Sequence, residues 1–309
     1  MNEFKLDNLL NKIHLADALE LMKHLPSNSI DLVLTDPPYF LDKLDNNWNS
    51  DTLEKVTNAS VVKSLPSGMK FSKQQGVNFY LWFREISSEL LRILKPGGFF
   101  FSFSSPRLYH RLVSAIDDVG FWIRDCFVWI YPHSQPKAMS LNHFLDKLEI
   151  PKQEKVELSK ELKNWKTPQI KSCFEPIVMA QKPTEGTFLE NFVKYRTGLV
   201  NTSIKLGNNL FPANVVKSEQ SDEYIDNYFL LPKPKITEKG DFNKHKTVKP
   251  LQLCEYLIKL TTYNEHSIVF DPFAGSGTTL LAAKINNRQF IGCDINKEYI
   301  EIAKKRLNF

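Results

Sequence analysis

Short runs rich in β-forming residues alternate with helical patterns along most of the 309-residue chain, and several runs stop abruptly at Gly, Pro or Asp. This alternation is typical of a mostly parallel sheet with helices on both faces. It lacks the eightfold repetition of a barrel, so it favours a doubly wound α/β sheet. The predicted strands are Lys12–Leu15, Asp31–Thr35, Phe99–Phe103, Cys126–Ile130, Pro176–Ala180, Ser267–Asp271 and Gln289–Asp294. The predicted helices are Tyr80–Leu94, Arg107–Val119, Val248–Thr261, Ser276–Asn286 and Asn296–Leu307.

Two regions depart from the alternation. The polar segment Phe40–Asn78 is predicted to form a long loop or a small helical excursion, and long ordered loops are usually functional. The second region, residues 132–243, combines a charged stretch with a stretch rich in Pro, Asn and Thr. We interpret it as an insertion that carries substrate specificity, from which one strand near residues 175–181 rejoins the sheet. Residues 1–131 and 244–309 then form the catalytic and cofactor-binding domain.

Composition sets the class of protein and its surroundings. Hydrophobic residues make up 42% of the chain and the net charge is +5, which permits a nucleic-acid partner without requiring one. The N-terminus lacks the apolar core of a signal peptide, and no run approaches a membrane span, so we expect a cytoplasmic protein without a membrane partner. The four cysteines are far apart, which predicts reduced thiols and no metal site: Cys126, Cys173, Cys254 and Cys293.

The first motif is Asp36-Pro37-Pro38-Tyr39, directly after a predicted buried strand. Ligands of open α/β sheets lie at the carboxyl ends of the strands. Two prolines stiffen the turn and remove two backbone donors, leaving a carboxylate, carbonyl acceptors and an aromatic ring. Asp36 and the Pro37 carbonyl could accept hydrogen bonds from both N–H groups of an aromatic amine and free its lone pair, while Tyr39 stacks on the ring. A plain turn that ends a strand is the alternative.

The second motif is Asp271–Thr279, DPFAGSGTT, between a predicted strand and a predicted helix. Gly275 and Gly277 let the backbone approach a ligand, and the helix N-terminus favours a carboxylate. The next strand ends in Asp294, where a carboxylate can bind ribose hydroxyls.

Three ligand classes compete for this motif. A phosphate loop would carry Gly-Lys-Ser/Thr, but Gly277 is followed by Thr278. A dinucleotide fingerprint would have a third glycine, and position 280 is Leu. A nucleoside cofactor without a pyrophosphate remains, and S-adenosyl-L-methionine fits. A purely structural turn is the alternative.

The pair of motifs resembles the amino-methyltransferases of DNA, whose catalytic signature is [D/N/S]PP[Y/F] and whose cofactor signature is FxGxG. Here the catalytic motif comes first and the cofactor motif last, which resembles the β group found in bacterial restriction-modification systems and phages. The resemblance implies a seven-stranded, mostly parallel sheet of the S-adenosylmethionine-dependent methyltransferase type, with an inserted target-recognition region. It also implies that double-stranded DNA is the substrate, with the target base flipped out of the helix.

The resemblance also assigns residues to the cofactor. Thr247 and Lys249 would hold its methionine end, although their segment could equally be a basic loop before a helix. Asp17 resembles the acidic position that contacts the adenine, or it is a helix N-cap. The full expected set is Asp17, Ala18, Asp36, Thr247, Lys249, Asp271, Phe273, Ala274, Gly275, Ser276, Gly277, Thr278, Asp294 and Ile295.

The expected activity is methyl transfer to an exocyclic amino group, adenine N6 before cytosine N4. Cytosine-N4 enzymes more often carry Ser before Pro-Pro, so Asp36 favours adenine. More remote alternatives are methylation of RNA or of a protein amide, and a catalytically idle DNA-binding module. The β group further implies a possible cognate restriction endonuclease and a possible homodimer.

Overall fold

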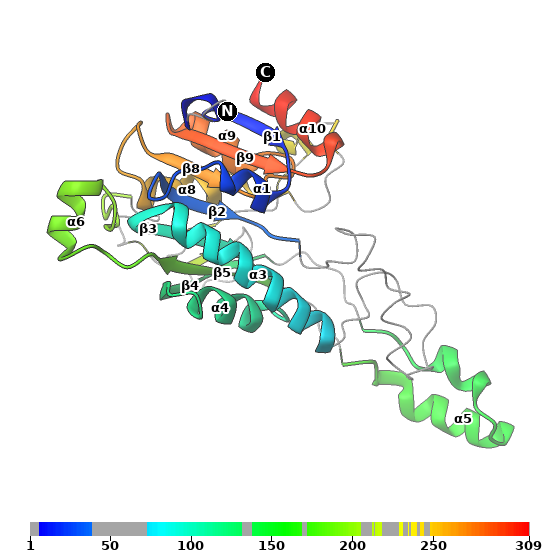
Figure 1. The fold of residues 1–309 in the computed structure, drawn as a ribbon. Helices are drawn as coiled ribbons and strands as arrows, with labels where there is room; N and C mark the ends of the chain where they lie inside the picture. The colour runs from blue at the N-terminus through cyan, green and yellow to red at the C-terminus, as the bar shows by residue number, and fades with distance from the viewer. Residues whose placement is uncertain are drawn as a thin grey trace.

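A computed structural model describes residues 6–38, 73–131, 138–168, 172–204, 212, 214–217, 229–230, 234, 236–239, 242–243 and 248–308 (Figure 1). One twisted sheet runs through the described part of the chain in the order β1-β9-β8-β2-β3-β5-β4-β6-β7. Its strands are β1 (Lys12–Leu15), β2 (Ile30–Thr35), β3 (Leu94–Phe103), β4 (Trp122–Ile130), β5 (Phe174–Gln181), β6 (Val215–Lys217), β7 (Phe229–Leu230), β8 (Ile268–Asp271) and β9 (Gln289–Asp294).

All neighbouring strands are parallel except where β5 pairs with β3 and with β4. In the spatial order of the sheet, the first seven strands, which begin with β1 and end with β4, match the predicted ones. They confirm the doubly wound, mostly parallel sheet. The short strands β6 and β7 were not predicted, and they extend the edge beyond β4. The single reversed strand matters for function, because its first residues lie at the edge where the parallel strands end.

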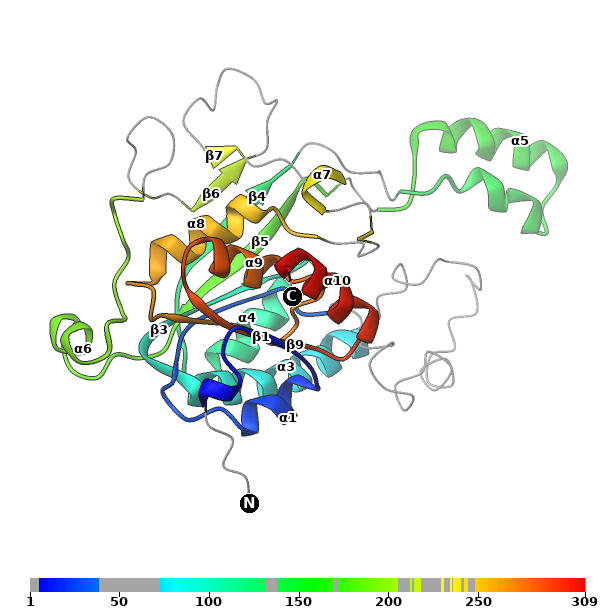
Figure 2. The same cartoon turned by 90° about the horizontal axis from the view of Figure 1, so that it is seen from above.

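Helices cover both faces of the sheet, as Figure 2 shows from above. The helices α1 (Ala18–Lys23), α3 (Lys73–Ile93) and α4 (Tyr109–Asp117) pack on one face. The helices α8 (Leu251–Thr261), α9 (Thr278–Ile285) and α10 (Lys297–Leu307) pack on the other. The remaining helical elements are η1 (Leu6–Asn8), η4 (Asn142–Lys147), α5 (Lys152–Glu161), η5 (Leu162–Asn164), α6 (Phe188–Tyr195) and α7 (Ile236–Lys239).

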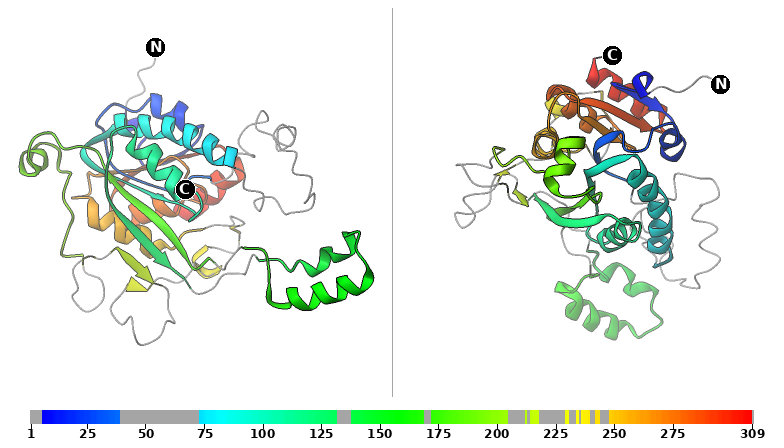
Figure 3. Two further views of the ribbon diagram at one scale, coloured as in Figure 1. Left: turned by 90° about the horizontal axis from the view of Figure 1, so that it is seen from below. Right: turned by 60° about the vertical axis from the view of Figure 1, so that its left-hand side comes forward.

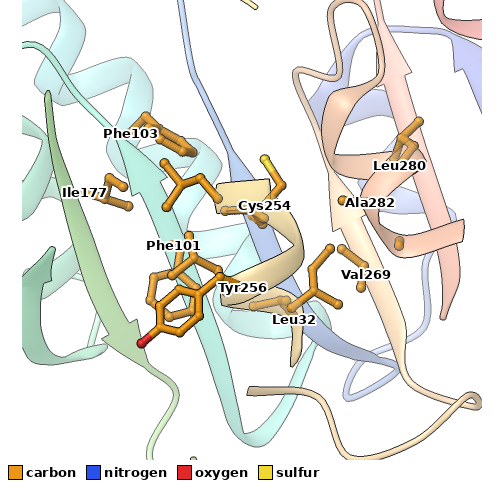
Figure 4. Packing of buried hydrophobic residues seen from close by; sticks show 14 of the residues in the cluster. Leu32, Phe101, Phe103, Ile177, Cys254, Tyr256, Val269, Leu280 and Ala282 are labelled. Carbon is orange, nitrogen blue, oxygen red and sulfur yellow. The ribbon is translucent and has the colours of Figure 1, made fainter. Parts of the chain in front are cut away.

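The phenylalanine run of β3 shows how the sequence specifies two cores. Phe99, Phe101 and Phe103 belong to the cluster under α8, α9 and α10, whereas Phe100 belongs to the cluster under α3 and α4. Alternate side chains of a strand point to opposite faces, so a continuous apolar run indicates a strand buried on both faces. Figure 4 shows Phe101 and Phe103 beside Cys254 and Tyr256 of α8.

The segment Lys95–Gly98 ends α3 as predicted but belongs to β3 rather than to a separate turn. The pairing register of β2 with β3 jumps from Ile30–Leu94 to Leu32–Phe99, so these residues form an irregularity in the strand. Within the described residues, no helix combines the length and the apolar character that a membrane crossing needs.

An arm of residues 138–168 leaves the sheet between β4 and β5 and carries α5 away from the rest of the fold (Figures 1 and 3). Its base is closed by the bridge between Ser140 and Lys166, and α5 has no buried residue. Because β4 is parallel to β3 and β5 is reversed, the arm emerges from the edge at which the parallel strands end. It therefore lies on the same side of the sheet as the motif residues.

Candidate active site

The two motifs meet at the carboxyl edge of adjacent strands. Asp36 follows β2 directly, and β2 pairs with β8, whose last residue is Asp271. Pro37 is buried and Pro38 is half-buried, which fits a stiff turn packed on the sheet. Tyr39 and Thr247 lie outside the described residues.

Asp271 links the two motifs through its own hydrogen bonds. Its Oδ1 atom accepts from the Thr35 hydroxyl at 2.7 Å and from the Phe273 backbone N–H at 3.1 Å. Burial raises the pKa of Asp271 to about 7, although both of these donors oppose the shift. Asp271 is only 3% exposed, so in this structure it shapes the turn on either side and is not presented at the surface.

The Gly-rich loop is fastened to the end of β9. The Gly275 N–H donates to Asp294 Oδ2 at 3.0 Å, and the Ala274 N–H donates to the Cys293 carbonyl at 2.9 Å. The second Asp294 oxygen accepts from the Asn296 N–H at 2.8 Å. Burial raises the pKa of Asp294 above its ordinary value, while these backbone donors lower it.

The far half of the loop faces α10. Arg306 donates to the Ser276 carbonyl at 2.9 Å and to the Thr278 hydroxyl at 2.8 Å. Gly277 has a φ of +78°, and an added Cβ would lie 2.9 Å from the Cβ of Ala303. The glycine at 277 is therefore required by its backbone conformation and by helix packing, and Ser276 and Thr278 are buried against protein.

At the neighbouring strand end, Asp17 is the N-cap of α1. Its Oδ1 atom accepts from the backbone N–H groups of Leu19 at 2.9 Å and Glu20 at 3.2 Å, so the N-cap alternative describes its local structure. Ala18 behind it is buried. In contrast, Leu15 and Ile295 at the ends of β1 and β9 are 54% and 49% exposed, and they leave apolar surface next to Asp294.

Lys249 directs its ammonium at Asp36. It forms an ion pair with Asp36 Oδ2 and a second one, of 3.4 Å, with Glu175 Oε2. The side chain of Lys249 is 8% exposed. Burial alone would lower the pKa of Lys249, but the carboxylates of Asp36 and Glu175 raise it above its ordinary value, so the ammonium stays charged.

Sequence reasoning missed Glu175, Thr35 and Arg306. Glu175 is far from either motif in the chain, and only the reversed direction of β5 brings it to the site. Thr35 directly precedes Asp36 in the sequence, but its hydrogen-bond partner, Asp271, depends on which strand lies beside β2. Arg306 lies near the end of α10, well after the loop in the chain. The sequence around it has no pattern that distinguishes it from a surface arginine.

Comparison with known proteins gives concordant results. The sequence profile of a DNA methylase family, that of the N6 and N4 methyltransferases, matches residues 30–305. The Type II methyltransferase M.HindIII of Haemophilus influenzae is 31% identical, over 97% of this chain and 96% of its own. The fold is similar to that of M1.HpyAVI in its SAM complex, with a TM-score of 0.53, 23% identity and coverage of 96% and 99% of the two chains.

The PvuII DNA methyltransferase, described as cytosine-N4-specific, has a TM-score of 0.57 at 20% identity, with 95% of this chain and 85% of that chain covered. The family match spans both motifs and the residues between them. The resemblance inferred from the two motifs is thus confirmed, and the chain belongs to the DNA methylase family of N6 and N4 methyltransferases.

Proposed function

We propose that this methylase transfers a methyl group from S-adenosyl-L-methionine to adenine N6 in double-stranded DNA. The observation that carries the proposal is the junction of the two motifs at one sheet edge. Asp36 follows β2, the Gly-rich loop follows β8, and the hydrogen bond of 2.7 Å from Thr35 to Asp271 joins them. An amino acceptor and a nucleoside cofactor would therefore meet between these strand ends.

The residues at the ends of β8, β9 and β1 suit the nucleoside part of the cofactor. Asp294 offers a carboxylate to ribose hydroxyls, and the exposed Ile295 and Leu15 offer apolar surface to a planar ring. Gly275, Ala274 and Phe273 form the wall of the loop on that side, and Asp17 and Ala18 lie at the end of β1. When bound, the cofactor supplies a methyl group on a positively charged sulfur. Asp271, Ser276, Gly277 and Thr278 are buried like Ala274 and Gly275, and their contacts with Phe273, Arg306 and Ala303 hold the loop in place.

The target amino group would be held by Asp36 and by the Pro37 carbonyl. Two acceptors aimed at the two N–H groups free the nitrogen lone pair for an in-line displacement, without a covalent enzyme intermediate. The proton leaves after methyl transfer, when the nitrogen has become acidic. Reaching this pocket requires the base to be flipped out of the duplex, and Tyr39 is proposed to stack on it.

The proposal of adenine as the target base rests on the first residue of the catalytic motif. Asp36 stands where cytosine-N4 enzymes more often have Ser. The fold itself does not select the base, since the cytosine-N4-specific PvuII enzyme shares it. Cytosine N4 is therefore the second candidate.

The insertion at residues 132–243 is proposed to be the target-recognition region. Its arm projects beyond the edge that carries Asp36, on the side from which a duplex would approach (Figure 1). Site-specific methylation is part of the same proposal, in line with the Type II methyltransferase relative. The resemblance to the β group adds a cognate restriction endonuclease and a homodimer to the proposal.

Mass spectrometry of nucleosides tests the reaction. Duplex DNA treated with the protein and S-adenosyl-L-methionine should contain N6-methyladenine, and long-read sequencing should place it in one sequence context. Detection of N4-methylcytosine instead would assign the methyl group to cytosine. Transfer of a labelled methyl group only to RNA or protein would exclude DNA as the substrate. The Asp36→Ala variant should lose methyl transfer with cofactor affinity nearly unchanged. The Asp294→Ala variant should weaken cofactor binding about 10-fold by calorimetry.

A further inference from the structure

A buried cation lies between two carboxylates at the centre of the site. Lys249 pairs with Asp36 and, at 3.4 Å, with Glu175, and its Nζ atom lies 5.0 Å from the centre of the Phe103 ring. The side chains of Asp36 and Glu175 are 20% and 22% exposed, so water screens the group only partly. Figure 4 shows Phe103, Ile177 of β5 and Cys254 of α8, which belong to the packed wall beneath this group.

Glu175 reaches this place because β5 runs against its neighbours. Ile177 of β5 pairs with Phe103, near the end of β3, and Glu175 pairs with Trp129, near the end of β4. The Ser104 N–H donates to the Pro176 carbonyl at 2.9 Å, which fixes the start of β5 at the carboxyl edge. The backbone on both sides of Glu175 is thus held by the sheet, and its side chain is delivered to Lys249 from a rigid element.

The pairing of one ammonium with two carboxylates indicates that Glu175 does more than neutralise the charge of Lys249. Asp36 alone would compensate the buried ammonium, and Glu175 adds a second carboxylate within ion-pair distance of it. Burying an additional charge is costly unless it is paired. An ammonium has three donors, so Lys249 can be shared between two carboxylates instead of being committed to Asp36.

We propose that Glu175 is a positioning residue that holds Lys249 and, through it, orients the Asp36 carboxylate toward the target amino group. By drawing the ammonium partly to itself, Glu175 keeps Asp36 a strong acceptor. Without it, Lys249 would pair with Asp36 alone, and the carboxylate would turn to the ammonium. The resemblance assigns Lys249 to the methionine end of the cofactor, and its ion pair with Asp36 gives it a contact on the acceptor side as well. The inference rests on the proposed methyl transfer.

The Glu175→Gln variant tests the proposal, because it keeps the shape of the side chain and removes its charge. We expect kcat on duplex DNA to fall about 10- to 100-fold, with the Kd and stoichiometry of S-adenosyl-L-methionine unchanged by calorimetry. We also expect the acidic limb of the pH profile of kcat to move to lower pH, since the substitution removes a negative charge from the cluster around Lys249. A merely structural defect would lower the binding stoichiometry and leave that limb in place.

Other titratable groups face this cluster. Asp271 interacts electrostatically with Asp36, Tyr131 with Glu175 and Lys249, and Cys254 with Lys249. Burial raises the pKa of Cys254 to about 12 and that of Tyr131 above its ordinary value, so both stay neutral across the profile. The pKa of Asp271, raised by burial to about 7, falls within it. The shift caused by Glu175→Gln should therefore persist in an Asp271→Asn background.

Glu255→Gln is the matched control, because the Glu255 side chain is 20% exposed, close to the 22% of Glu175, but pairs with Lys259 within α8, at 3.5 Å. It should leave kcat, its pH profile and the cofactor Kd unchanged. Wild-type kcat and pH profile in Glu175→Gln would overturn the inference, as would a weakened cofactor Kd with kcat retained. If Glu175→Gln does not fold, Glu175→Asp is measured by the same criteria. A wild-type chain that does not methylate DNA would instead refute the proposed function.

Discussion

The Thr35 hydroxyl donates a hydrogen bond of 2.7 Å to Asp271 Oδ1, between two residues that are 236 positions apart in the chain. Thr35 precedes Asp36, and Asp271 opens the Gly-rich motif. The same Asp271 oxygen accepts from the Phe273 N–H, so one carboxylate fixes both turns. The relative placement of the proposed acceptor and donor sites therefore depends on one buried polar contact in the middle of the sheet.

Replacing Thr35 by Val should destabilise the protein by about 1–3 kcal/mol, because it removes one of the hydrogen-bond donors to the buried Asp271 carboxyl group. Urea unfolding measures this change. Thr35→Ser is the control: it retains the donor and should recover most of the loss. Equal destabilisation by Val and Ser would show that the methyl group, and not the hydrogen bond, stabilises the junction.

The raised pKa of Asp271 predicts a pH dependence of stability. Burial raises this pKa from 3.8 to about 7, so between these values the folded chain holds a proton that the unfolded chain releases. The stability that Asp271 contributes is complete below about pH 4 and is lost as the pH rises to about 7, by on the order of 2–4 kcal/mol. Asp271→Asn has no carboxyl group to titrate.

The free energy of unfolding should therefore fall more steeply from pH 5 to pH 8 in the wild type than in Asp271→Asn. Other carboxylates titrate equally in both proteins, so the difference between the two curves isolates this group. Parallel curves would mean that Asp271 is ionised in the folded protein throughout this range.

Gly277 should tolerate no side chain. Its φ of +78° is unfavourable for other residues, and a Cβ would meet that of Ala303 at 2.9 Å. Gly120 makes a matched control, because its φ is +107° but its Cβ would lie 3.7 Å from Leu91. Gly277→Ala should cost about 1–3 kcal/mol more than Gly120→Ala in urea unfolding, owing to the added clash with α10. A similar cost at both positions would argue that α10 moves aside freely.

The sequence predicted the features that depend on local pattern. The alternation of runs gave the seven strands, and the three phenylalanines of β3 that share one face are buried, as a doubly covered strand requires. Asp36 and Asp294 lie at strand ends because each follows an apolar run. These signals are local, and tertiary packing reinforces them.

The remaining features depend on neighbours that no local pattern reveals. Glu175 enters the site only because β5 is reversed, and a strand's direction is set by its partners. Ser276 and Thr278 lie in the Gly-rich motif Asp271–Thr279, yet their polar groups accept hydrogen bonds from Arg306 of α10. The projection of α5 was also unpredictable, since a charged helix without an apolar face has the same pattern whether it lies on the surface or leaves it.

The arm should be separable from the fold. Because Ser140 and Lys166 are paired at its base, residues 141–165 can be replaced by a two-residue Asn-Gly turn. Since α5 buries nothing, we expect the free energy of unfolding and the cofactor Kd to stay within about 1 kcal/mol of the wild type. If residues 132–243 recognise the target, duplex affinity in a salt-matched titration should fall at least about 10-fold. Lys194→Ala, on α6 away from the arm, should change none of these quantities. Unchanged duplex affinity without the arm would place target recognition elsewhere in the insertion.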